Sequence, residues 1–415
     1  MDRADCTLYN DANCPKGMDL TNIINKDTLD FVTFGCWGVY CLDGEVNLEK
    51  GKKIYGGLRV VKGLEEFAKI QPLDFVTLTG DNIYSRPLEE TESEYTTRPQ
   101  FDIDRHLVDG FSNCFKDVNV EKFFVGIGNH DIETCDVINA QLRYDDPRWR
   151  MPGTYYSVVH KTNNFNIRMI FMDTNLYSVK QPFCTKSTVD HEIAKKIQLD
   201  WLIAQMAIAR INSEMIILAG HIPIECNNHK FKRQYFNEDV AGGGWGNDSL
   251  NLIQEPHLGE TDSSEFDIED LRWTTHSPEL EKDISKLHKE YYIALYICAD
   301  THNKQLIQGN NELPIQLICG TGGTSLDTVK PDKRTDIGKR TIFSKKSYGF
   351  SHISINKYKD IQIDVYQTTL QDLKLEFSHV ILNENTHEES SSRSRSDEVY
   401  NIHTRTPARA NSSIR

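Results

Sequence analysis

Five short apolar runs in this chain each lead into a cluster of polar side chains. The run at 75–78 is followed by Gly80, Asp81 and Asn82, and glycine and asparagine are residues that end a strand. The other four runs, at 31–34, 123–127, 215–219 and 294–298, lead into Gly35-Cys36-Trp37-Gly38, Gly128-Asn129-His130-Asp131, Gly220-His221-Ile222-Pro223 and Ala299-Asp300-Thr301-His302-Asn303. Short apolar runs bounded by turn residues predict buried strands, and α/β proteins place their chemistry at the carboxyl ends of such strands. The pattern therefore predicts a metal site assembled from five loops.

The composition limits the class of protein and of partner. With 415 residues the chain is long enough to bury a large core in one domain or two. The formal net charge of −14 argues against nucleic acid or an anionic membrane surface as a partner, because both require a basic surface. No apolar run approaches the ~20 residues that a membrane span requires, so we expect no membrane span.

The compartment is less constrained than the fold. The first residues have neither the basic nor the apolar region of a signal peptide, which favours an intracellular protein. Of the ten cysteines, Cys36, Cys298 and Cys319 fall in or beside predicted core strands and are expected to be buried thiols or ligands. The remaining cysteines lie in polar stretches and are able to pair in an oxidising compartment, so their disulfide state stays open.

The chain divides into a polar segment at 1–28, one large domain at 29–383 and a Ser/Arg-rich tail at 384–415. We expect the first segment to lie over the surface and the tail to be disordered, because it has almost nothing apolar to bury. A region at 225–275 has no clean periodicity and is interpreted as an insertion within the domain.

Helical periodicity separates several of the predicted strands. A helix is expected at 58–70, between the runs at 31–34 and 75–78, which makes a βαβ unit with two neighbouring parallel strands. Further helices are expected at 103–115, 190–211 and 279–291. The helix at 190–211 is expected to bury an apolar face made of Ile193, Ile197, Leu202, Met206 and Ala209. The last part of the domain is expected to be all β.

In this order the five loops resemble those of the purple acid phosphatases, within the calcineurin-like metallophosphoesterases, and most closely the short tartrate-resistant type. The likeness extends to the stretches at 144–155, 171–174, 198–202 and 347–350, and it covers residues 29 to 370 except 225–275. It implies an α/β fold, a four-layer α/β/β/α sandwich of two mixed sheets flanked by helices. It also implies a metallophosphatase, an enzyme that cleaves phosphomonoesters when a hydroxide held by two metal ions attacks phosphorus.

The resemblance assigns roles to individual residues. It implies that Asp81 bridges the two ions and that His130 acts beside them as an acid, a base or a phosphate-orienting group. The other ligands so implied are Cys36, Tyr84 and His302 at the first ion and Asn129, His221 and Asp300 at the second. His229 lies one residue out of register with a second histidine of the family near the leaving group, and we assign it that catalytic role on this basis.

The chain departs from the family pattern at two ligand positions. Cys36 stands where the family has aspartate, and Asp300 stands where it has histidine. Among Fe, Zn and Mn, the soft thiolate of Cys36 favours zinc. Cys36 is equally consistent with a small buried thiol, and Asp300 with a turn residue. The alternative function is therefore a pseudo-phosphatase of the same fold, a scaffold that binds a protein partner through the 225–275 insertion or the tail.

Overall fold

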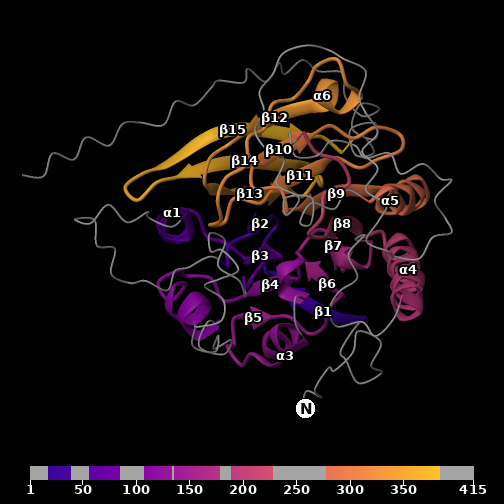
Figure 1. Cartoon of the computed structure of the whole chain (residues 1–415), viewed down its shortest axis with the longest axis horizontal. Coiled ribbons are helices and arrows are strands. Elements are labelled where there is room, and N and C mark those ends of the chain that lie inside the picture. The colour runs from indigo at the N-terminus through magenta and orange to yellow at the C-terminus, as the bar shows by residue number, and fades with distance from the viewer. Residues whose placement is uncertain are drawn as a thin grey trace, which may run out of the picture.

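The computed structural model describes residues 17–38, 56–84, 107–132, 135–177, 188–227 and 277–383. Within these residues two mixed β-sheets lie face to face at the centre of the molecule, with helices outside them (Figure 1). The eight-stranded sheet has the order β1 (Met18–Ile23), β6 (Tyr156–Lys161), β7 (Asn166–Phe171), β8 (Met215–Ala219), β9 (Ile293–Cys298), β11 (Gln316–Cys319), β10 (Lys304–Ile307) and β12 (Thr341–Lys345). The seven-stranded sheet has the order β15 (Leu373–Ile381), β14 (Ile361–Thr368), β13 (Gly349–Ile355), β2 (Leu29–Phe34), β3 (Phe75–Thr79), β4 (Phe123–Gly126) and β5 (Trp149–Arg150).

The helices cover the outer faces of the sheets. Helix α1 (Gly56–Ile70) packs on β13, β14 and β15, and α4 (Thr188–Ile211) packs on β7 and β8 beside α5 (Pro278–Tyr291). Figure 1 shows α1 on one side of the sheets and α4 and α5 on the other. The remaining helical elements are α3 (Cys135–Arg143), α6 (Asp336–Arg340), the π-helical turn η3 (Val108–Asn113) and the 3-10 turns η4 (His130–Ile132) and η5 (Thr174–Tyr177). The expected four-layer α/β/β/α sandwich is thereby confirmed.

The strands read as continuous apolar runs because both of their faces are buried. In β2, Phe31 points into the core between the sheets, where it stacks on Phe75 of β3 at 4.7 Å. Val32 and Val76, the next residues, belong to the second core under the helices. Burial on both faces is typical of parallel strands covered by helices, so this part of the pattern carries no alternation.

The first βαβ unit forms as predicted. β2 pairs with β3 in parallel register, and β3 pairs with β4 in the same way. On the opposite edge of β2, the pairing with β13 is antiparallel, which is how the β-rich end of the chain joins the same sheet. The carboxyl ends of β2, β3 and β4 consequently meet at one edge.

Two sequence expectations are wrong in detail. Residues 18–23 do not simply lie over the surface: they form β1, which pairs in parallel with β6 at the edge of the larger sheet. In α4, Leu202 is fully buried, whereas Ile193 and Ile197 are 49% and 45% exposed. The buried face instead includes Gln198, whose side-chain amide forms hydrogen bonds with the backbone N–H and C=O of Asp173.

Several expectations fall outside the described residues. They are His229, nearly all of the 225–275 insertion and the tail from 384 onward. Among the described residues, no helix combines the length and the apolar character needed to cross a membrane. Cys298 and Cys319 are buried free thiols as expected, and Cys114 forms no disulfide with any residue that the structure describes.

Candidate metal centre

The same strained turn follows three strands from both sheets. Cys36, Asp81 and Asp300 are each the second residue after their strand, and their φ angles are 54°, 55° and 58°. A residue with a Cβ atom pays about 1–2 kcal/mol in this left-handed region, so the surrounding structure has to enforce the conformation. Backbone hydrogen bonds between neighbouring loops do so, such as that from Cys36 N–H to Gly80 O at 2.9 Å. The turn therefore brings a thiol and two carboxyl groups to one place.

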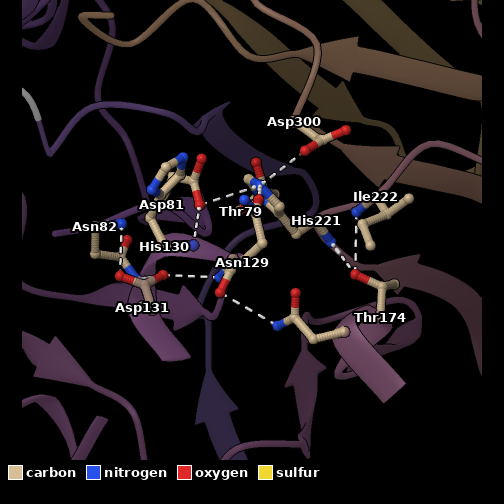
Figure 2. A network of polar contacts seen from close by, with 12 residues as sticks. Thr79, Asp81, Asn82, Asn129, His130, Asp131, Thr174, His221, Ile222 and Asp300 are labelled. Atoms are coloured by element: carbon tan, nitrogen blue, oxygen red, sulfur yellow. Dashed lines mark hydrogen bonds and ion pairs between the residues drawn. The ribbon is translucent and has the colours of Figure 1, made fainter. Parts of the chain in front are cut away.

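His221, the second residue after β8, lies among the oxygens of three other loops (Figure 2). Its Nε2 is 3.2 Å from Asp81 Oδ1, 3.1 Å from Asn129 Oδ1 and 3.7 Å from Asp300 Oδ1. Its Nδ1 is 2.7 Å from the carbonyl oxygen of Thr79. Since a carbonyl only accepts, Nδ1 carries a proton, and a neutral imidazole then has its lone pair on Nε2.

The surroundings of Nε2 call for a positive charge. A lone pair facing two or three oxygen atoms is repulsive unless a proton or a metal cation lies between them. Burial alone would lower the pKa of His221, but the Asp81 carboxylate overrides it and raises the pKa to about 9. The same pairing holds the pKa of Asp81 well below its usual range against the opposing effect of burial. A metal ion bound at this point would take the place of the proton on His221.

Three potential ligand atoms are close enough to share one ion. The ligand atoms of Cys36, Asp81 and His221 all lie within 4.8 Å of one another, and all three residues are buried. A thiolate, a carboxylate and an imidazole form a donor set that zinc accepts. Burial and the nearby Asp81 charge raise the pKa of the Cys36 thiol well above its ordinary value, so a bound ion has to displace the thiol proton. The residues thus fit a metal ion chemically.

The second oxygen of Asp81 contacts a different residue, Tyr84. Its Oδ2 accepts a hydrogen bond of 2.9 Å from the hydroxyl of Tyr84, while Oδ1 also accepts one from the backbone N–H of His130 at 3.1 Å. The ring of His130 packs against that of Tyr84 with centroids 4.3 Å apart. Asp81 thereby touches groups on both of its sides, as a bridging carboxylate requires.

Two further predicted ligands, Asp300 and His302, lie outside the group formed by Cys36, Asp81 and His221. Asp300 is buried and its Oδ2 has no hydrogen-bond partner, while burial raises the pKa of this carboxyl to about 7. His302 has a side chain 19% exposed and lies outside the compact group of Cys36, Asp81 and His221. Its backbone N–H donates to Asp327 Oδ2 at 3.0 Å. The division of all these ligands between two ions stays a prediction.

Asp131 is a buried residue beside the candidate ligands to which the sequence pattern gave no role. Its buried carboxylate accepts from the N–H groups of Asn82 and Ile83 at 2.9 and 3.0 Å and from that of Gly128 at 2.7 Å. It therefore ties the loop after β3 to the loop after β4. Burial, with the charge of Asp81, raises its pKa to about 7. The only signal was its place in the Gly-Asn-His-Asp cluster, because a buried supporting carboxylate and a catalytic one look alike in sequence.

Comparison with known proteins gives these contacts a family context. No protein-family model matches the chain. Tartrate-resistant acid phosphatase type 5 of Mus musculus is 24% identical over 350 residues, covering 79% of this chain and 84% of the relative. The same enzyme of Homo sapiens is 26% identical over 318 residues, covering 74% and 76%. The chain resembles the purple acid phosphatases.

Solved structures support the purple acid phosphatase fold. Purple acid phosphatase PPD1 from yellow lupin (Lupinus luteus) seeds aligns with a TM-score of 0.52 at 15% identity, covering 87% of this chain and 55% of that one. GAP50, described as the anchor in the inner membrane complex of Plasmodium, aligns with a TM-score of 0.57 at 16% identity, covering 88% and 95%. At these identities the structures show the shared fold, which agrees with the resemblance drawn from the five loops.

Proposed function

We propose that this protein is a metal-dependent phosphohydrolase that cleaves phosphomonoesters. The observation that carries the proposal is the convergence of Asp81, Asn129 and Asp300 oxygens on the Nε2 lone pair of His221, with the Cys36 thiol alongside. Relatives at 24–26% identity are acid phosphatases by name, and strained left-handed turns present Cys36, Asp81 and Asp300 at this site.

Each residue has a distinct task in the proposed reaction. Cys36, Asp81 and His221 hold metal, with Asn129 and Asp300 as further ligands on the His221 side. Metal ions in such a site polarise the phosphoryl oxygens and acidify a coordinated water. The Thr79 carbonyl fixes the His221 tautomer, so that Nε2 stays available as a ligand.

Two further side chains act around the Asp81 carboxylate. The Tyr84 hydroxyl orients Asp81 through its bond to Oδ2. His130, whose backbone is tied to Asp81 and whose ring lies on Tyr84, is the group assigned to give a proton to the leaving oxygen.

The test measures metal content and hydrolysis on the same preparation. The protein is purified without chelator, its metals are quantified per chain, and turnover of an aryl phosphate is followed. Asp81→Asn should lower bound metal and reduce turnover by at least ~100-fold, because it removes the central anionic ligand. Asp117→Asn, a matched change at an exposed aspartate, is the control. Full turnover in Asp81→Asn places any hydrolysis elsewhere and overturns the proposal.

A second candidate function is a metal-binding scaffold without turnover. Two observations favour it: the departures at Cys36 and Asp300, and the fold shared with GAP50, which is described as an anchor. It differs from the first candidate in one measurable outcome. A scaffold retains stoichiometric metal that depends on Asp81 but shows no hydrolysis of phosphomonoesters at any metal concentration.

A further inference from the structure

A basic stretch at 328–346 contrasts with the acidic balance of the whole chain. It contains seven lysines and arginines and two aspartates, whereas the chain has a net charge of −14. Its first residue follows Asp327, which forms two hydrogen bonds with His302. The Asp327 N–H donates to His302 O at 2.8 Å, and the His302 N–H donates to Asp327 Oδ2 at 3.0 Å. The basic stretch therefore begins beside His302, which the resemblance implies is a metal ligand.

The other end of the stretch returns to the same place. Lys345, the last residue of β12, pairs in antiparallel register with Lys304 of β10, two residues after His302. Lys346 comes next, and its ammonium lies 3.4 Å from the hydroxyl of Thr328, the first residue of the stretch. Lys346 therefore lies at the end of the β10–β12 pair that is nearest in sequence to His302.

Three of the seven cations of the stretch already have partners within the protein. Arg334 pairs with Asp332 at 2.8 Å, Arg340 with Glu225 at 2.6 Å, and the Lys333 ammonium donates to backbone carbonyls. Lys345 and Lys346 are exposed and form no ion pair with any residue that the structure describes. Two adjacent uncompensated ammonium groups attract an anion and bind phosphate as point charges.

We propose that Lys346, supported by Lys345, binds a second anionic group of the substrate while a first phosphate group occupies the metal centre. The inference rests on the proposed phosphohydrolase function and narrows its substrate class to small phosphate esters that carry two phosphate groups. The metal centre supplies the site for the scissile group, and the basic rim distinguishes a bisphosphate from a monophosphate.

The experiment compares two ligands that differ by one phosphate group. Binding of a hexose 6-phosphate and of a hexose 1,6-bisphosphate to the metal-loaded protein is measured by calorimetry at low ionic strength. The wild-type protein should bind the bisphosphate about tenfold more tightly, and in Lys346→Gln the ratio of the two affinities should fall to about one. Added salt should remove the same preference, because the lysine is exposed.

Lys116→Gln is the control, since Lys116 is exposed and precedes β4, at the opposite end of that strand from the centre. An unchanged affinity ratio in Lys346→Gln overturns the inference and leaves the lysines as a solvated face. Hydrolysis of an aryl phosphate, measured in parallel, separates the two proposals. Turnover with an unchanged ratio sinks the inference alone, and a lysine-dependent ratio without any turnover sinks the phosphohydrolase function alone.

Discussion

Nε2 of His221 lies 3.2 Å from Oδ1 of Asp81, and the two residues follow strands that belong to different sheets. The contact exists only because the sheets pack face to face with the carboxyl ends of β3 and β8 at one edge. The N–H of Asn82, the residue after Asp81, donates a hydrogen bond to Asp131 of the next loop. This bond also helps to fix the turn that presents Asp81. The centre is thus a product of the docked sheets rather than of any local segment.

Gly128 provides a steric test of the centre. A Cβ atom at this position would stand 2.2 Å from Asp81 Oδ1, whereas one at Gly126 would meet nothing closer than 3.4 Å. Gly128→Ala should therefore displace Asp81, lower metal affinity by at least ~10-fold and cost about 1–3 kcal/mol of stability through overpacking. Gly126→Ala, at the end of the same strand, should retain metal. Metal titration and thermal unfolding of both variants measure this, and equal metal affinity in the two would contradict the placement of Asp81.

Restoring the family residue at each of the two altered positions should have a different effect on metal binding. Cys36→Asp should change metal preference from zinc towards iron, because a hard carboxylate replaces a soft thiolate beside Asp81. Asp300→His should strengthen the binding of a second ion on the His221 side and raise turnover when metal is limiting. Titration of each variant with Zn(II) and Fe(II), with hydrolysis followed in parallel, measures both effects. If neither occupancy nor rate changes, Cys36 and Asp300 are not ligands.

His160 predicts a pH dependence of stability that is separate from the metal centre. This fully buried side chain stacks on Phe75, and burial, aided by the positive charge of Lys122, lowers its pKa to about 3. Between pH 6.5 and 3 the unfolded chain binds the extra proton, so this contribution to stability is present above pH 6.5 and is lost as the pH falls. Between pH 6.5 and 4.5 the loss should be about 2 kcal/mol.

The variant His160→Gln isolates that contribution from the carboxylates. Urea unfolding is measured for both proteins across this pH range, and the difference in unfolding free energy between them is plotted against pH. The difference should fall by about 2 kcal/mol on acidification, since glutamine does not titrate. A difference independent of pH would show that His160 is protonated in the folded state.

Helix α4 offers a matched pair for its buried and exposed faces. Leu202 is 0% exposed and Ile193 is 49% exposed, although the sequence pattern placed both on the apolar face. Leu202→Ala should cost about 2–5 kcal/mol because it leaves a cavity, and Ile193→Ala should cost no more than about 0.5 kcal/mol. Chemical denaturation of the two variants measures the difference. Equal costs would restore the face that the periodicity predicted.

The sequence alone was enough to predict the strands and the polar clusters that follow them. Each apolar run is a strand buried on both faces, so its composition alone marks it, and each polar cluster begins within three residues of the strand's end. Asp81 and Asn129 could be predicted as neighbours because the parallel strands β3 and β4 bring their carboxyl ends to one edge, whereas His221 joins them only through the docking of the second sheet. The βαβ unit made by β2, α1 and β3 followed from the same local periodicities.

Only the tertiary structure decided how that chemistry is supported. Asp131 and Gln198 are polar in sequence, yet they are buried because partners from other elements satisfy their hydrogen bonds. Ile193 is apolar, yet it is exposed because the sheet lies against a different stripe of α4. Periodicity records what a side chain prefers, whereas burial depends on which surface the rest of the chain brings against it. The same reason makes the left-handed turns at Cys36 and Asp300 invisible in sequence: neighbouring loops impose them.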